Sequence, residues 1–313
     1  MPEKPRNKYA DLLKYFGMRV AGTCVQIFNI NSALTFGRLL GDFVYLVDKT
    51  HRQRAIDNLQ AAYGSTASED WIRKTARASM EHLGMVLMEV LYTPRLVKVN
   101  TSFKYVSLDG VPEVLRLLVQ DRPVIMLSGH YGNWELMSFA MATLGFSSYS
   151  VARHLPNPYI HEYVFGIREK TGQRILTKKG ATTTVTEVLE QNQIVCFLAD
   201  QDAGRRGVFV DFFGRKASTF RSIALLAIKY NTPIAVMAAT RQGKKFQYKL
   251  SVEEVIHPEQ WKDRQDEVGW ITATYTKAIE RVARRCPGQY LWAHRRWKTR
   301  PKGEKAGDEG NSG

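Results

Sequence analysis

The sequence predicts an α/β fold, in which a mostly parallel central sheet is flanked by helices and preceded by a helical N-terminal region. The chain has 313 residues, 44% hydrophobic and 24% charged, which suits a globular protein with a sizeable core. Beyond Asp109, short continuous apolar runs alternate with segments of helical period, the pattern of parallel strands joined by helices. Up to Arg95 the period is helical throughout.

Residues 1–48 are expected to form membrane-associating helices. "VAGTCVQIFNINSALTFG" is uncharged over 18 residues, whereas a spanning helix needs about 20 predominantly apolar residues. Basic residues precede this stretch, apolar "LLGDFVYLV" follows it, and no signal-peptide cleavage site is present. The pattern favours a helical hairpin lying in the membrane interface. The alternative is a buried amphipathic pair that caps the domain.

Residues 49–302 are expected to form one α/β domain. "HRQRAIDNLQAAYG" and "DWIRKTARASMEHLGMVLMEVLY" are helical, with Gly64 as the stop of the first. Alternation in "KFQYKLSVEEV" predicts an antiparallel or edge strand, and residues 303–313 are expected to be a disordered tail. The other predicted strands are 123–128, 147–153, 173–176, 193–200 and 232–240. The predicted helices between and after them are 133–145, 158–172, 181–191, 219–231, capped by Ser218 or Thr219, and 267–286.

The charge balance indicates an anionic partner. Lys and Arg number 45 against 30 Asp and Glu, a net charge of +15, which favours nucleic acid, an acidic lipid surface or a phosphorylated substrate. The three cysteines are scattered without CxxC spacing, which predicts a reducing compartment and neither a disulfide framework nor a zinc site. No metal and no cofactor is expected.

The candidate chemistry lies in "SGHYGNWEL", directly after the apolar run 123–127. Ligands of open α/β sheets bind beyond the carboxyl ends of the strands, so His130 is placed to act as a general base. Glu135, in the first turn of the next helix, is expected to reach back to the imidazole and fix its tautomer. The helix start is expected to offer N–H groups to an oxyanion. The cluster at 200–202 follows a second strand at the same edge. A capping or surface His–Glu pair is the structural alternative.

Five stretches together resemble the bacterial late acyltransferases of lipid A synthesis, the lauroyl and myristoyl transferases of the lysophospholipid acyltransferase superfamily. "GHYGNWE" is similar to their His-x4-acid motif, with Glu135 where aspartate is frequent. "HRQRAIDNLQAAYG" resembles their "RAxxNL" helix and "RHLPNPYI" their "RPxxNP" segment. "ADQDAGRRGVFVDFFGRKASTF" and "YLWAHRRWKTRP" resemble their "DQD…G…VFVxFFGxxAxT" and "WxHRRxKTRP" motifs. The resemblance covers roughly residues 5 to 302.

The resemblance implies acyl transfer from acyl carrier protein, or coenzyme A, to a hydroxyl of a lipid A precursor or related glycolipid. His130 would take the hydroxyl proton and Glu135 would orient His130. Further residues are expected to bind substrate: Asn133, Arg153, Arg168, Gln201, Asp202, Arg205, Arg295 and Arg296. Three of them have a structural alternative: Asn133 as a helix cap, Asp202 as a hydrogen-bond partner of the loop that follows it, and Arg296 as an anchor of the C-terminal segment. The implied location is the cytoplasmic face of the bacterial inner membrane.

Three other interpretations stay open at this point. The acceptor could be a lysophospholipid or another glycolipid or aminolipid on the same fold. Water could replace the lipid hydroxyl, which would make the protein a hydrolase. The basic run "HRRWKTRPK" with Trp292 and Trp297 could instead bind nucleic acid by phosphate contact and stacking.

Overall fold

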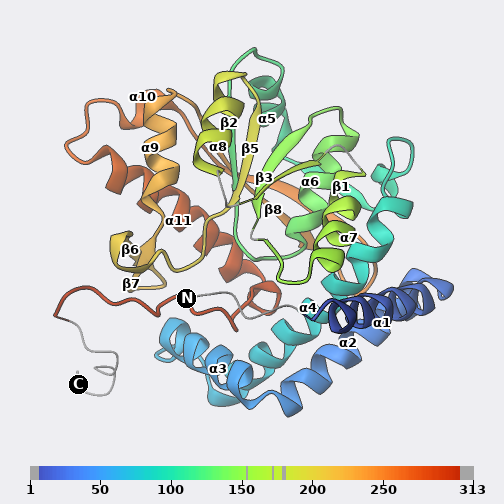
Figure 1. Cartoon of the computed structure of the whole chain (residues 1–313). Helices are drawn as coiled ribbons and strands as arrows, with labels where there is room; N and C mark the ends of the chain where they lie inside the picture. Colours follow the sequence, from blue (N-terminus) through green and yellow to red (C-terminus); the bar gives the residue numbers. More distant parts are fainter. Residues whose placement is uncertain (1–6, 153, 171–172, 178–180, 304–313) are drawn as a thin grey trace.

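The computed structural model describes residues 7–152, 154–170, 173–177 and 181–303, and its centre is a seven-stranded sheet (Figure 1). The strand order is β1-β9-β8-β2-β5-β3-β4, and every neighbouring pair is parallel except β8 with β9. The predicted mostly parallel sheet is therefore confirmed. The predicted tail lies, apart from residue 303, outside the described residues.

The three central strands of this sheet, 124–128, 194–198 and 234–241, are predominantly apolar runs, as the sequence predicts. The antiparallel segment β9 is not an edge strand, because β1 pairs on its far side; the four-residue β1 has no prediction in the sequence. The strands are β1 Val106–Asp109, β2 Val124–Ser128, β3 Ser148–Ala152, β4 Gln173–Thr177, β5 Ile194–Leu198, β8 Ile234–Arg241 and β9 Tyr248–Ile256.

Alternate side chains of β2 enter two separate cores, which is why this strand reads as a continuous apolar run. Ile125 and Leu127 pack into the core under the helices of one face, and Val124 and Met126 into the core under the other. The first face carries α8 Ala181–Glu190, α9 Arg221–Lys229 and α11 Glu267–Arg285, and the second carries α5 Val111–Leu118 and α6 Trp134–Thr143. Helix α7 Pro158–Glu169 lies beside β4 and α1.

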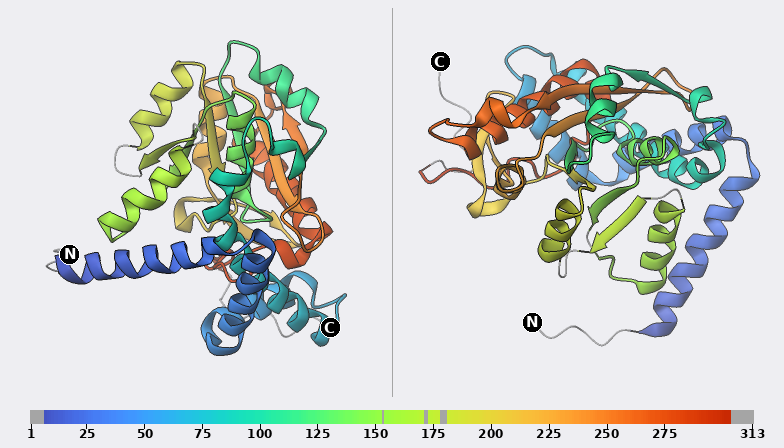
Figure 2. Two further views of the ribbon diagram at one scale, coloured as in Figure 1. Left: turned by 90° about the vertical axis from the view of Figure 1, so that its right-hand side faces the viewer. Right: turned by 90° about the horizontal axis from the view of Figure 1, so that it is seen from above.

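Four helices form the N-terminal region: α1 Lys8–Ile27, α2 Ile30–Val47, α3 Lys49–Tyr63 and α4 Glu69–Leu96. Asn7, Asn29, Asp48 and Ser68 each begin one of them by accepting a backbone N–H through the side chain. Helices α2, α3 and α4 lie below the sheet in Figure 1, and α1 reaches out from the side of the body (Figure 2). No helix among the described residues is long and apolar enough to cross a membrane.

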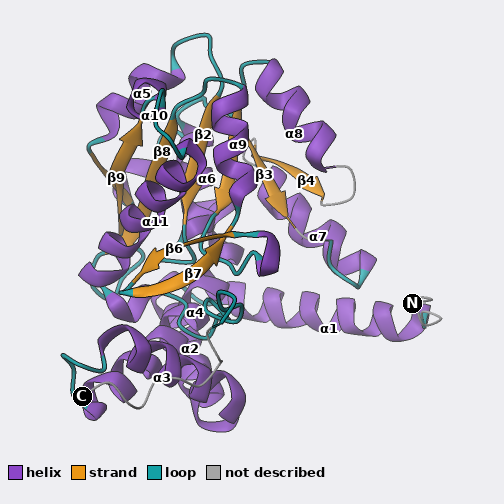
Figure 3. Cartoon of the chain, turned by 90° about the vertical axis from the view of Figure 1, so that its left-hand side faces the viewer, coloured by secondary structure: helices purple, strands orange, loops and turns teal. Residues whose placement is uncertain are grey.

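A two-stranded hairpin, β6 Val208–Phe212 and β7 Arg215–Thr219, lies at the edge of the sheet that faces α3 (Figure 3). Its turn residue Phe213 packs its ring 5.3 Å from that of Tyr63 in α3. The prediction that Ser218 or Thr219 caps the next helix is wrong. Phe220 stands at that position without a side-chain cap bond, and Ser218 donates to the Gly204 carbonyl instead. The short helices are η1 Ser102–Lys104, η2 Gly204–Arg206, α10 Pro258–Trp261 and η3 Pro287–Gln289.

Candidate active site

The loop between β2 and α6 carries His130 and is fixed by its own backbone. The Gly132 N–H donates to the Gln289 carbonyl, and the Asn133 N–H donates to the Ala239 carbonyl, each at 3.0 Å. Gly132 has φ +55°, and a Cβ there would lie 1.9 Å from the Ala239 carbonyl oxygen. Only glycine fits this position, because a side chain would meet both backbone strain and a neighbouring strand. The N–H groups of Gly132 and Asn133 are thus occupied, and in the first turn of α6 the Leu136 N–H is occupied by the Asn133 side chain.

His130 forms a buried pair with Asp200. Asp200 comes directly after β5, which is the strand that pairs with β2. Oδ1 of Asp200 lies 2.7 Å from Nδ1 of the imidazole, and Oδ2 accepts the His130 backbone N–H at 2.7 Å. Burial disfavours the charged carboxylate, but attraction to His130 and the hydrogen bonds from it outweigh burial and lower the pKa of Asp200 below its ordinary value. An ionised carboxylate only accepts, so Nδ1 of His130 donates and Nε2 is left to accept a proton.

Glu135 does not hold the imidazole, and this corrects the expected His130–Glu135 contact. Its carboxylate forms a two-point ion pair with Arg168 of α7, in which Arg168 Nε donates to Oε2 at 2.8 Å and Nη2 donates to Oε1. The physical reason is helical geometry, because the first turn of α6 directs Glu135 toward the neighbouring helix α7. Asp200 approaches His130 from the adjacent strand, where the carboxyl ends of β2 and β5 meet.

Three side chains surround the imidazole. The Trp134 ring lies 5.2 Å and the His294 ring 4.2 Å from the His130 ring, measured between centroids. Nε2 of Gln201 lies 3.5 Å from Nε2 of His130, which places Gln201 at the expected acceptor side of the base. Burial, followed by the charge of His130, lowers the pKa of His294 to about 4, so His294 is neutral at pH 7.

The "RAxxNL" helix places His294, a link that the sequence did not reveal. Nδ2 of Asn58 donates to the carbonyls of Trp292 and His294 at 2.7 Å each. Nη1 of Arg54 donates to the carbonyl of Ala293 at 3.2 Å. Two motifs more than 230 residues apart in sequence are therefore one structural unit, in which α3 clamps the C-terminal segment beside the catalytic loop.

Three residues expected to bind substrate are committed to the protein itself. Asn133 is fully buried, caps α6 through the Leu136 N–H and donates to Glu89. Arg296 is 2% exposed and donates to the Ser218 carbonyl and the Thr219 hydroxyl. Asp202 accepts from three groups of Gly204 and Thr299. For each of them the alternative role in capping or anchoring is the one found.

The remaining expected residues divide by exposure. Arg205 and Arg295 are exposed, and Gln201 lies at the base. Arg168 faces Glu135 rather than open solvent, and Arg153 lies outside the described residues. Asp200, which the sequence placed at this edge without a role, is the partner of the base. The sequence signal for this role was the position of Asp200 directly after an apolar strand, because that strand, β5, pairs with β2.

Among the described residues, one group could hold a metal ion. It consists of His130, Asp200 and His294, whose possible ligand atoms lie within 4.8 Å of one another. Such a set can hold a divalent cation. Here both Asp200 oxygens already accept hydrogen bonds from His130, so a metal ion would compete with the pair that fixes the tautomer.

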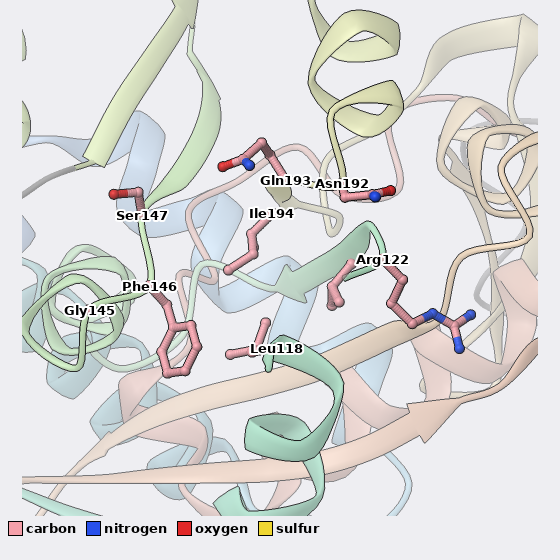
Figure 4. Close-up of a pocket in the computed structure, with 9 residues that line it drawn as sticks. Leu118, Arg122, Gly145, Phe146, Ser147, Asn192, Gln193 and Ile194 are labelled. Carbon is pink, nitrogen blue, oxygen red and sulfur yellow. The ribbon is translucent and has the colours of Figure 1, made fainter. Parts of the chain in front are cut away.

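A separate cavity lies at the opposite edge of the sheet, where β2, β3 and β5 begin (Figure 4). Arg122, Ser147, Asn192 and Gln193 line it together with apolar side chains such as Phe146. None of the residues that line it belongs to the His130 constellation, and open α/β sheets carry their chemistry at the other edge. We therefore place the active site at His130.

The fold is an α/β fold in which a buried histidine–carboxylate pair, His130 and Asp200, lies at the carboxyl edge of a mostly parallel sheet. Residues 4–299 match the family model described as bacterial lipid A biosynthesis acyltransferase. The chain therefore belongs to this family and is an acyltransferase, which agrees with the resemblance of its five motifs.

Similar proteins include acyltransferases of lipid A biosynthesis and phosphatidylinositol mannoside acyltransferases. The lipid A biosynthesis palmitoleoyltransferase of Escherichia coli is 26% identical over 302 residues, 94% of each chain. The lipid A biosynthesis lauroyltransferase of the same species is 25% identical over 75% of this chain and 76% of its own. A phosphatidylinositol mannoside acyltransferase of Mycobacterium tuberculosis is 28% identical over 49% of this chain and 50% of its own. The solved 1-acyl-sn-glycerophosphate acyltransferase PlsC of Thermotoga maritima is a more distant likeness, with 14% identity, a TM-score of 0.37 and coverage of 83% of this chain and 97% of that one.

Proposed function

We propose that this protein transfers a fatty acyl chain from the thioester of acyl carrier protein, or of coenzyme A, to a hydroxyl of a lipid A precursor or related glycolipid. The single observation that carries the proposal is the buried pair of His130 and Asp200, with Nε2 of the imidazole left to accept a proton. The names of the relatives support the class of acceptor, since one is a palmitoleoyltransferase of lipid A biosynthesis and another is a phosphatidylinositol mannoside acyltransferase.

The reaction follows from the tautomer that Asp200 fixes. Nε2 of His130 takes the proton of the acceptor hydroxyl while the oxygen attacks the thioester carbonyl carbon. Asp200 stabilises the imidazolium that forms, because its carboxylate is ionised and 2.7 Å from Nδ1. The carbon–sulfur bond then breaks, an ester forms, and the proton passes from His130 to the leaving thiolate.

Cations around the site suit the phosphates of donor and acceptor. Glu135 holds the guanidinium of Arg168 in one orientation by a two-point ion pair, and guanidinium groups bind phosphates in a fixed geometry. Arg205 and Arg295 add exposed positive charge. The segments that carry them are held together by Arg296, which donates to the carbonyls of Gln201 and Ser218. We assign the binding of anionic headgroups or carriers to this side of the molecule.

Helices α1 and α2 supply a surface for the membrane, consistent with the hairpin that the sequence favours. Each carries a stripe of exposed apolar side chains at three- and four-residue spacing: Tyr9, Leu13, Phe16 and Val20 on α1, and Phe36, Leu39, Phe43 and Leu46 on α2. Exposed Lys8, Lys14, Arg19 and Arg38 accompany them. Apolar stripes flanked by cations are typical of helices that lie in an anionic bilayer surface, which we place at the cytoplasmic face of the bacterial inner membrane.

A transfer assay in detergent micelles tests the proposal. Labelled acyl-acyl carrier protein and acyl-coenzyme A are each offered with a lipid A precursor, a phosphatidylinositol mannoside or a lysophospholipid. We expect label on the lipid A precursor with wild-type protein and a loss of transfer in His130→Ala. His257→Ala is the matched control and should transfer normally, because His257 is a half-buried histidine at the N-cap of α10, outside the His130 constellation.

The other outcomes are equally informative. Label on phosphatidylinositol mannoside or lysophospholipid alone would keep the mechanism and change the acceptor. Release of free fatty acid without transfer would identify a hydrolase. Normal transfer by His130→Ala would remove His130 from the reaction.

A further inference from the structure

A buried ion pair lies beneath the catalytic loop and takes no part in the proton transfer described above. Glu89 of α4 is 0% exposed, and Arg241, the last residue of β8, is 5% exposed. Nη1 of Arg241 donates to Oε1 of Glu89 at 2.6 Å. Removing two charges from water is costly, and such pairs frequently add nothing to stability compared with apolar residues. What else the two residues contact therefore decides what the pair does.

The second oxygen of Glu89 reaches the loop through one side chain. Oε2 accepts the Tyr248 hydroxyl at 2.6 Å and Nδ2 of Asn133 at 2.8 Å. The side-chain oxygen of Asn133 accepts the Leu136 N–H at 2.8 Å and so begins α6. Glu89 thus orients the one residue that ends the loop behind His130 and begins the helix of Glu135.

Arg241 reaches the same loop through His82, a second buried residue of α4. Nε of Arg241 donates to Nδ1 of His82 at 3.4 Å, and Nε2 of His82 lies 3.1 Å from the Gly132 carbonyl oxygen. A guanidinium only donates, so Nδ1 accepts, and the ring proton sits on Nε2 and points at that carbonyl. Burial and the charge of Arg241 lower the pKa of His82 to about 3, which keeps the ring neutral and in this tautomer.

We propose that Glu89 and Arg241 are positioning residues for the acyl transfer. They fix the catalytic loop at two successive residues: Arg241 holds the Gly132 carbonyl through His82, and Glu89 holds the Asn133 side chain. Together these contacts set the distance between His130, which meets the acceptor, and Glu135, which holds Arg168. This inference rests on the proposed function, because its readout is the rate of transfer.

Two substitutions disturb the two anchors separately. Arg241→Lys keeps a cation beside Glu89 but lacks the Nε–H group that orients His82. Glu89→Gln keeps the size of the side chain but replaces one accepting oxygen with an amide NH₂. That group faces Arg241 if it replaces Oε1, or Asn133 and Tyr248 if it replaces Oε2, and each of these is a donor. Tyr248→Phe is the matched control, because it removes a hydrogen bond from the same Glu89 oxygen and leaves both loop contacts in place.

The experiment measures kcat and KM for both substrates, together with the melting temperature, on the full chain in micelles. We expect kcat to fall about tenfold or more in Arg241→Lys and Glu89→Gln, with KM unchanged, since misplacement of about 1 Å can cost up to about 10²-fold. Tyr248→Phe should lower the melting temperature while it retains kcat.

Three results would overturn the inference: unchanged kcat in the folded fraction of both variants, an equal fall of kcat in Tyr248→Phe, or a rise of KM without a change of kcat. If Glu89→Gln does not accumulate as folded protein, Arg241→Lys decides alone by the same criteria. Absence of transfer by the wild type would instead contradict the proposed function, so the two failures are distinguishable.

Discussion

At the scale of single residues, Asp200 decides which nitrogen of His130 carries the proton. Asp200→Asn keeps the shape but places an amide that can donate to Nδ1, which favours the tautomer with the proton on Nε2 and leaves the base unable to accept. We expect kcat to fall about 10²- to 10⁴-fold, the scale of general-base assistance. The transfer assay measures it against Asp57→Asn, an exposed carboxylate of α3. A kcat within twofold of the wild type would contradict the role given to Asp200.

Glu135 is expected to matter through Arg168 rather than through His130. Glu135→Gln removes the charge that holds the guanidinium and should weaken the binding of an anionic substrate, which raises KM. Glu135→Ala should lower kcat/KM by about 10- to 10²-fold, less than His130→Ala, because a hydrogen bond to a charged group contributes about 1.5–3 kcal/mol. The pH profile of kcat separates a role through Arg168 from a role through His130. If Glu135 is only the partner of Arg168, its substitution leaves the acid limb of this profile in place. A Glu135→Gln variant with wild-type constants would show that the charge is unimportant.

His294 makes stability depend on pH in a direction that its pKa fixes. Its pKa is about 4 in the folded protein, against about 6.5 for an unperturbed histidine, so the unfolded chain binds more protons between these values. Stability is therefore complete above about pH 6.5 and is lost as the pH falls toward 4, by about 3 kcal/mol from this residue. Urea unfolding of wild type and His294→Gln at pH 7 and pH 4 measures the difference. Equal losses in the two proteins would contradict the burial of a neutral His294.

At the scale of elements, two glycines let α2 and α4 cross with their backbones in contact. A Cβ on Gly84 of α4 would lie 2.1 Å from the Gly37 carbonyl oxygen of α2, where backbone atoms cannot yield. We expect Gly84→Ala to destabilise the protein by roughly 1–3 kcal/mol. Gly166→Ala in α7 is the control, because nothing lies within 4 Å of its Cβ, and it should stabilise by about 0.5–1 kcal/mol. Thermal unfolding decides, and a stabilised Gly84→Ala would show that the helices can separate freely.

The same crossing joins the apolar stripe of α2 to the catalytic loop. Helix α4 contacts α2 at Gly84 and carries Glu89, which holds Asn133, less than two helical turns away. The surface that we assign to the membrane and the base that meets the lipid hydroxyl are therefore attached to one rigid element. A change at the crossing is expected to reach the reaction as well as the fold.

At the scale of the whole molecule, we expect the chain to bind anionic vesicles through α1 and α2. Leu39→Glu with Phe43→Glu places two charges on the exposed stripe of α2 and should lower vesicle binding more than tenfold, because a buried apolar side chain contributes about 1.5–3 kcal/mol. Val119→Asp is the matched control: Val119 is 74% exposed, next to Leu118 of the cavity at the opposite edge of the sheet. Co-sedimentation at low and high salt measures binding. Complete release by salt alone would point to charge without apolar insertion.

The sequence by itself determined the alternation of apolar runs and helical periods, and with it the mostly parallel sheet and the edge at which His130 lies. It left β9 as an antiparallel or an edge strand, and the structure decided for antiparallel pairing. These features are local, because burial on both faces requires an unbroken apolar strand and a helix requires its own period. The five motifs also determined the family. The short β1 and the cap of α9 escaped prediction, since four residues carry no period and Phe220 supplies no cap signal.

Only the tertiary structure decided which charged groups meet. Glu135 is five residues from His130 yet pairs with Arg168, whereas Asp200, seventy residues away, holds the imidazole because β5 is the neighbour of β2. Asn133 and Arg296 turned inward for the same reason: strand order and helix crossings bring distant partners closer than sequence neighbours. Spacing along a chain fixes the face of a helix or strand on which a side chain lies, but the partner on that face is fixed by the topology that packs against it.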